Sequence, residues 1–315
     1  MRRRLAGLAA LLLATGAVGQ PRPALARDPE AVIVQELVVT ARRGGPAWWR
    51  VTAPNGAVAW VMGIPEALPR GLKWDQTLLR LRLKGAQGFV GPPAVQAGLG
   101  DVFTLIRLRG AFRSRTPMEA SLPPALKARF LRDREQLGKD SRAYSGWTPL
   151  VAALLMIQDF RKQAGLELRQ PASQATSLAH AAGVRVVPAG VFRAVPFVQA
   201  VRTGLDREGP ACLEDALDEI EAGPQKIRAA AQGWAHGDVA AALAAQRGYE
   251  KCLASLPQGA DLADTTMADT ARTLEARLGA GGETVAVVDL RILLAQGGVL
   301  QRLQARGFKV DSPGS

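Results

Sequence analysis

The sequence predicts an α/β (α+β) fold, in which a central mixed β-sheet is built from the N- and C-terminal segments around a mostly helical middle region. Strand-like runs rich in valine, alanine and tryptophan lie near residues 47–63 and 284–310. Helical patterns, several with proline at their start and glycine at their end, fill most of the chain between them. With 315 residues, of which 48% are hydrophobic and 22% charged, the chain can bury a large core, which argues against disorder.

The first 26 residues predict a cleaved secretory signal peptide. Arginines at positions 2–4 precede an apolar run of about 14 residues from Leu5 to Val18, and the small-x-small pattern at 24–26 places cleavage after Ala26. A membrane anchor, the alternative, needs roughly 20 apolar residues, and no later stretch is long and apolar enough to span. We therefore expect an exported, periplasmic protein with no transmembrane helix after signal cleavage.

Residues 27–46 read as an irregular arm or linker, in which the stretch 32–41 favours a short strand. The runs 47–54 and 57–63 predict a β-hairpin, because Asn55-Gly56 between them is a strong two-residue turn signal. A loop leading into a helix follows, and then a short strand at 87–91 that Pro92-Pro93 terminates.

The middle region predicts helices at 122–138, 148–165 and 176–183, followed by a strand at 184–190. Further helical patterns cover 192–206, 210–222, 224–234, 238–254 and 264–279. The end of the chain predicts a strand at 284–290, a helix at 298–307 and a last strand at 308–310.

The two cysteines, Cys212 and Cys252, form an even count in a chain that carries an export signal. This favours one disulfide over two separate buried thiols, because the periplasm is oxidising. The bridge would close a loop of about 40 residues, worth about 3–4 kcal/mol in the chain-entropy description.

The basic charge is spread along the chain. The formal net charge is +12, and removal of residues 1–26 would take away four arginines and no acid. The densest basic runs, at 41–45, 80–85 and 107–115, lack the interleaved aromatic residues of single-strand binders. We expect no nucleic-acid binding. An anionic envelope polysaccharide or lipid headgroup remains an alternative partner.

Familiar catalytic signatures are absent from the sequence. The only two histidines, His180 and His236, lie 56 residues apart in unrelated contexts, whereas metal sites usually need paired ligands at helical or loop spacing. No G-x-S-x-G elbow, P-loop or G-x-G-x-x-G motif occurs.

Three words in the sequence do carry a pattern. The first is "WVMGIPEALPRGLKW" at 60–74, the second is "GWAHGD" at 233–238, and the third is "VAVVDLRILLAQGGVLQRLQARGFKV" at 285–310. In order and spacing they resemble the TraB/GumN family, exported relatives of the Tiki metalloproteases, over residues 47–312. Members carry a Gly-x-x-His turn after the first strand pair, an acid after the next strand, and a second Gly-x-x-His after the last long strand. The resemblance implies a divalent metal held by these groups, which would activate water.

This chain departs from the family pattern at each chemical position. Gly63 is kept, but Glu66 stands at the first histidine position and Arg291 at the second, just after Asp289. Gly91-Pro92-Pro93 stands where family members carry the acid. Because arginine does not deprotonate in proteins, it cannot be a metal ligand. We therefore expect a Glu66–Arg291 ion pair across the former site, and no catalysis by the family mechanism.

Three functions follow from this pattern. The preferred one is a non-catalytic family member, a pseudoenzyme, with a binding or scaffold role in the cell envelope, no cofactor, and an envelope protein as one possible partner class. The second is a residual hydrolase or protease that uses Glu66, Asp289 and Asp238 around Mn²⁺ or another hard divalent cation. The third is a basic module that binds anionic envelope polymers.

Overall fold

A six-stranded mixed sheet with strand order β10-β1-β2-β9-β4-β7 organises the computed structural model. The structure describes residues 28–40, 44–96, 98–168, 170–245, 247–256 and 259–313. The sequence-predicted signal peptide and its cleavage point after Ala26 lie outside these residues. The sheet strands are β1 (Trp48–Thr52), β2 (Val58–Ile64), β4 (Gly88–Gly91), β7 (Val186–Pro188), β9 (Glu283–Asp289) and β10 (Lys309–Asp311).

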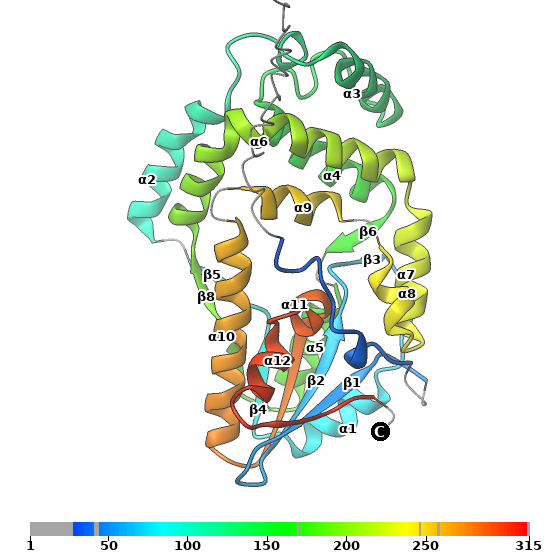
Figure 1. Ribbon diagram of the computed structural model, residues 1–315, viewed down its shortest axis with the longest axis vertical. Helices are drawn as coiled ribbons and strands as arrows, with labels where there is room; N and C mark the ends of the chain where they lie inside the picture. The colour runs from blue at the N-terminus through cyan, green and yellow to red at the C-terminus, as the bar shows by residue number, and fades with distance from the viewer. Residues whose placement is uncertain are drawn as a thin grey trace, which may run out of the picture.

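The sheet joins the two ends of the chain, as the sequence predicts (Figure 1). Strands β2 and β9 run parallel, from Val58 opposite Glu283 to Ile64 opposite Asp289. Strand β4 lies parallel on the other side of β9, and β10 pairs antiparallel with β1. The predicted mixed α/β class is therefore confirmed.

The β1–β2 hairpin forms around Asn55-Gly56, as predicted. Gly56 has a φ of 84°, a conformation that glycine adopts without steric cost. The side chain of Asn55 accepts a hydrogen bond from the Ala57 amide at 3.0 Å and donates one to the Leu278 carbonyl at 3.1 Å. The turn is thereby tied to the helix that precedes β9.

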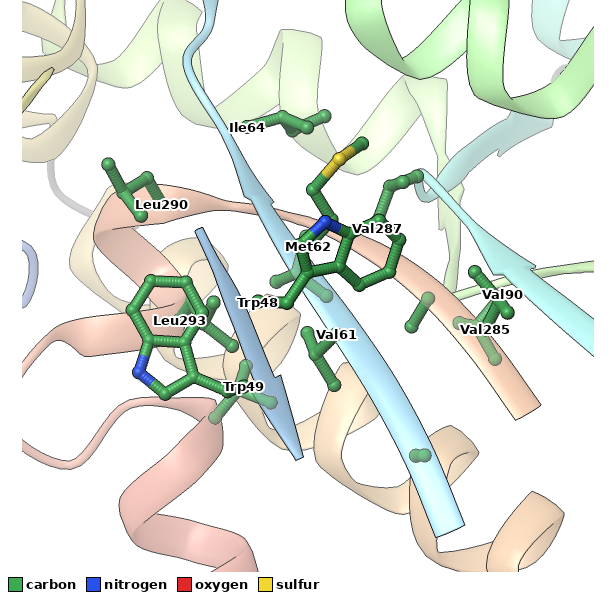
Figure 2. Close-up of a cluster of buried hydrophobic side chains, with 14 of the residues drawn as sticks. Trp48, Trp49, Val61, Met62, Ile64, Val90, Val285, Val287, Leu290 and Leu293 are labelled. Carbon is green, nitrogen blue, oxygen red and sulfur yellow. The ribbon is translucent and has the colours of Figure 1, made fainter. Parts of the chain in front are cut away.

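Helices cover both faces of the sheet. They are α1 (Thr77–Gly85), α5 (Gln170–Ala181), α10 (Gly259–Gly279), α11 (Leu290–Leu294) and α12 (Val299–Gln304). On one face of the hairpin, the Arg82 guanidinium of α1 lies 3.2 Å from the centre of the Trp60 ring. On the other face, Trp49 lies beside Leu290 and Leu293 of α11 (Figure 2).

A second hydrophobic core lies in the helical middle region (Figure 1). It is built mainly by α4 (Pro149–Gln163), α6 (Ala194–Ala222) and α9 (Gly248–Ser255), with Met156, Leu213 and Leu217 at its centre. The Cys212–Cys252 disulfide joins α6 to α9, so the predicted cysteine pairing is present. The remaining helices are α2 (Leu99–Leu108), α3 (Pro124–Gln136), α7 (Gln225–Ala235) and α8 (Val239–Leu243).

The smaller elements complete the chain. They are two-stranded sheets of β3 (Ala67–Pro69) with β6 (Leu166–Leu168) and of β5 (Ala94–Gln96) with β8 (Val191–Arg193), and 3₁₀ turns at Gln35–Leu37, Arg109–Phe112 and Met118–Ala120. Among the described residues, no helix is both long enough and apolar enough to cross a membrane.

Four local predictions are wrong. The patterns at 192–206 and 210–222 form one helix, α6, that runs through Pro210, because a proline removes one hydrogen bond and packing on both sides can outweigh that loss. The pattern at 238–254 divides into α8 and α9. The arm makes isolated bridges at Ile33 and Thr40 instead of a strand. The first core strand ends at Ile64, one residue after the glycine that the sequence suggested.

Candidate functional site

The three former-site segments meet at one edge of the sheet. Because β2, β9 and β4 are mutually parallel, their carboxyl ends lie side by side. A cavity of about 340 Å³ opens there, and its lining includes Glu66 after β2, Pro92 and Pro93 after β4, and Asp289 and Arg291 after β9. The structure thus brings together the residues that the motif comparison singled out.

Gly63 is needed for packing near this edge. A Cβ atom at position 63 would overlap Cδ1 of Leu290 and would lie 3.0 Å from Cζ3 of Trp49. The backbone of β2 can therefore approach α11 closely only because position 63 is glycine. Gly63 thus allows α11, the helix that follows β9, to pack against β2.

The "GWAHGD" segment at 233–238 contacts the same end of strand β2. The Trp234 indole N–H donates a hydrogen bond to the Gly63 carbonyl at 2.7 Å, and its ring centre lies 5.4 Å from that of Trp74. Asp238 caps α8 by accepting a hydrogen bond from the Ala241 amide at 3.0 Å. Asp238 is absent from the residues that line the cavity, so its position is structural.

Glu66 pairs with Arg161, which the sequence did not reveal. Its carboxylate lies 3.4 Å from the Arg161 guanidinium, which also lies 3.0 Å from Glu219 and 3.4 Å from Glu250. The predicted Glu66–Arg291 ion pair is wrong: no such pair occurs among the described ion pairs. Arg161 is a helix residue in an apolar segment, and only the tertiary fold places it opposite Glu66.

Burial dominates the electrostatics of Glu66. Loss of solvent raises the pKa of this carboxyl, and the nearby Arg161 only partly offsets that effect. Glu219 and Glu30 add to the upward shift by like-charge repulsion. Glu66 is therefore easier to protonate than an exposed glutamate.

Asp289 and Arg291 stand at the start of α11. The Asp289 carboxylate caps the helix, accepting from the Arg291 amide at 2.9 Å and the Ile292 amide at 3.4 Å. Burial, with repulsion from Glu30, raises the pKa of Asp289 to about 7. Burial, with repulsion from Arg247, lowers the pKa of Arg291, whose guanidinium donates to the Leu243 carbonyl.

The N-terminal arm supplies another wall of the cavity. Arg247 holds the arm by ion pairs to Asp28 at 2.6 Å and to Glu30 at 3.0 Å, and Glu30 lines the cavity. The backbone of the arm is also bonded to α11, through the Val34 amide and the Leu294 carbonyl at 2.9 Å. The sequence predicted an irregular arm or linker here, and the acids at 28 and 30 carry no motif that marks them as site residues.

The histidines lie away from this chemistry. His180 is exposed on α5, and His236 is exposed at the end of α7, where its Nδ1 lies 2.8 Å from the Gln232 carbonyl. Neither histidine is among the residues that line the cavity.

The residues present do not fit the divalent metal that the family resemblance implies. Within the described part of the chain, no three or more histidine, cysteine, aspartate or glutamate side chains are grouped closely enough to hold a metal ion. Glu66 is engaged by a guanidinium, and Arg291 carries a second guanidinium where a ligand would be needed. Four carboxylates and three arginines line the cavity, and ion pairs join Glu66 and Glu250 to Arg161 and Glu30 to Arg247.

A family model described as the TraB/PrgY/gumN family matches residues 47–312, which is most of the chain. No curated protein and no solved structure shows a significant match to it. The matched range agrees with the range over which the three sequence words resemble that family.

Proposed function

From the premise that the chain belongs to the TraB/PrgY/gumN family, we propose that it is a non-catalytic member, a pseudoenzyme with a binding role in the cell envelope. The observation that carries the proposal is that charged, ion-paired residues stand where the family has metal-binding histidines, at the carboxyl edge of the sheet. Glu66 stands at one histidine position and is paired with Arg161, and Arg291 stands at the other.

The cavity supports binding as the retained activity. At about 340 Å³ it falls in the range of small-molecule sites, and apolar side chains form much of its lining. The fold keeps the hydrogen bond between Trp234 and Gly63 next to Ile64, which lines the cavity. A pseudoenzyme that keeps the scaffold and the cavity can bind a ligand without transforming it.

Export is the second part of the proposal, and it rests on the N-terminal sequence and on the Cys212–Cys252 bridge. Disulfides persist in oxidising compartments such as the periplasm. Expression of the full chain with a C-terminal tag, followed by fractionation and mass determination, tests this part. A periplasmic product that begins at Arg27 supports it, and a cytoplasmic product that retains Met1 contradicts it.

A residual hydrolase is the second candidate, because Asp289 has a pKa raised to about 7, as general acids and bases often have. This candidate requires that Glu66 and Asp289, two carboxylates alone, hold a cation such as Mn²⁺, against the ligand chemistry described for the site.

Thermal unfolding with Mn²⁺, Co²⁺ or Zn²⁺ separates the two candidates. An ion that binds the folded state must raise the melting temperature. Three proteins are compared: the wild type, Glu66→Gln and the control Glu167→Gln, whose carboxylate lies outside the cavity. For a pseudoenzyme, we expect metal to leave the melting temperature of each protein unchanged. A rise of several degrees that Glu66→Gln abolishes and Glu167→Gln preserves would overturn the pseudoenzyme proposal.

A further inference from the structure

We propose that the cavity at the carboxyl edge of the sheet binds a small organic cation, an ammonium or guanidinium group on a short apolar body. This inference rests on the proposed binding function and names the class of ligand. It follows from a count of charges, from one unpartnered carboxylate oxygen and from the apolar lining.

The charges around the cavity do not balance. Three guanidinium groups, those of Arg161, Arg247 and Arg291, face six carboxylates. The carboxylates belong to Asp28, Glu30, Glu66, Glu219, Glu250 and Asp289. Arg161 is shared by three of them and Arg247 by two. Four of the six carboxylates, those of Glu30, Glu66, Glu250 and Asp289, line the cavity beside the three guanidinium groups, so a formal excess of negative charge remains. The raised pKa values of Glu30, Glu66 and Asp289 reduce this excess near neutral pH.

The excess is held where water screens it weakly. Glu219 is fully buried and the Arg161 side chain is 7% exposed. Attraction between opposite charges is much stronger in such surroundings than in bulk water. One added positive charge in the cavity would therefore be stabilised, and one added negative charge would be repelled.

One carboxylate oxygen also lacks a partner. Oε1 of Glu250 lies 3.4 Å from the Arg161 guanidinium, whereas its Oε2 is buried and accepts no hydrogen bond from the described residues. A buried acceptor without a donor costs free energy. Oε2 has no surface open to the cavity, so a bound cation would stabilise this carboxylate by charge attraction and not by a hydrogen bond to that oxygen.

The rest of the lining suits the body of such a ligand. It includes aliphatic side chains from several elements: Ala172, Ala189, Ile227, Ala230, Leu253 and Leu262. These side chains offer no hydrogen bonds, so they favour a hydrocarbon chain over a sugar or a phosphate. A bare metal ion would leave this apolar surface unused, and the carboxylates are not grouped to coordinate one.

Three six-carbon probes test the charge requirement on the full chain: n-hexylammonium, 1-hexanol and hexanoate. Their hydrocarbon parts match, so differences in affinity report on the head group. By calorimetric titration near neutral pH we expect hexylammonium to bind at least about tenfold more tightly than hexanol, and hexanoate to show no binding. Equal affinity for hexylammonium and hexanol, or tighter binding of hexanoate, would overturn the cation assignment while leaving the cavity a ligand site.

Two variants test the location. Glu250→Gln keeps the shape of the side chain and removes its charge, so hexylammonium affinity should fall about tenfold while any hexanol affinity stays the same. Glu30→Gln removes a charge from a different wall of the cavity and should also weaken hexylammonium binding. Glu167→Gln, outside the cavity, is the control and should leave the affinity unchanged. Unchanged hexylammonium affinity in both cavity variants would refute the site. Absence of binding by all three probes would also refute the cation proposal, whereas the pseudoenzyme proposal is judged separately by the metal experiment.

Discussion

Arg161 lies at the junction of α4, α6 and α9 and faces a carboxylate from each of three other segments. Glu219 and Glu250 belong to the helical core, and Glu66 follows strand β2 of the sheet. A buried ion pair contributes little relative to an apolar replacement of both partners, but removal of one partner leaves the other charge uncompensated. Arg161 is therefore the residue on which the charge network of the cavity depends most strongly.

Arg161→Met should lower the free energy of unfolding by about 3–5 kcal/mol, because three carboxylates would lose their shared cation. Arg70→Met is the matched control, since Arg70 pairs with Glu167 at 2.7 Å but its side chain is 72% exposed. That control should cost at most about 1 kcal/mol. Urea denaturation measures both, and equal losses in the two variants would show that Arg161 has no special place in the network.

Asp289 gives a prediction about pH. Its pKa is raised to about 7 in the folded protein, against about 3.9 in an unfolded chain. Between these values the unfolded state has lost the proton and the folded state still holds it, so this residue lowers stability as the pH rises from about 4 to about 7. Above about pH 7 the loss is complete.

Asp289→Asn removes this dependence and keeps an oxygen that can cap α11. The stability of the variant relative to the wild type should therefore increase by about 2–4 kcal/mol between pH 4 and pH 8. Glu30 and Glu66 also have raised pKa values and repel Asp289, so the difference between the two proteins reports on Asp289 together with its effect on these two carboxylates. Urea denaturation at the two pH values tests the prediction, which fails if the difference between the proteins is independent of pH.

Individual elements differ in how far the sequence reveals them. The β1–β2 hairpin was predictable because Asn55-Gly56 encodes its turn locally, and β9 because its apolar run is continuous. The continuity of α6 through Pro210 could not be predicted from the sequence, because it depends on packing against α4 and α9.

The candidate site shows the same division. The family resemblance singled out Gly63, Glu66, Asp289 and Arg291 in the sequence, and the parallel strands β2 and β9 bring the last three to one edge of the sheet. It could not identify Arg161, Glu250 or Glu30, which come from distant helices and from the arm and carry no local pattern. Charge complementarity alone suggested Arg291 as the partner of Glu66, and the three-dimensional arrangement assigns that place to Arg161.

Gly63→Ala tests the contact between β2 and α11. Its methyl group would overlap Leu290, so we expect a loss of about 1–3 kcal/mol from overpacking. Gly110→Ala is the control, because no heavy atom outside its own chain neighbours lies within 4 Å of the added methyl group. Thermal unfolding measures the stability of both variants. A Gly63→Ala protein as stable as the control would show that the contact between β2 and α11 can relax freely.

At the scale of the whole molecule, two hydrophobic cores both contribute to the lining of the cavity, for example through Val287 of one and Ile227 of the other. One core belongs to the sheet and its covering helices, and the other to α4, α6 and α9. The disulfide lies entirely within the second core. Loss of the disulfide should therefore destabilise the helical half of the molecule before it affects the sheet.

Replacement of both cysteines by alanine should lower stability by about 3–4 kcal/mol, because the unfolded chain regains the freedom of a loop of 40 residues. Hydrogen exchange should speed up in α6 and α9 before it does in β2 and β9. Uniform acceleration across both halves would instead show that the two cores unfold as one unit.

The pairing of residue 58 with residue 283 also has a consequence for biosynthesis. When the ribosome has made the hairpin, the strand that must pair with β2 does not yet exist, and the apolar edge of β2 has no native neighbour until nearly the whole chain has been synthesised. Closing so large a loop is slow, and an uncovered strand edge invites pairing with other chains. We therefore expect the yield of soluble protein to follow the supply of chaperone more closely than the stability of the finished fold.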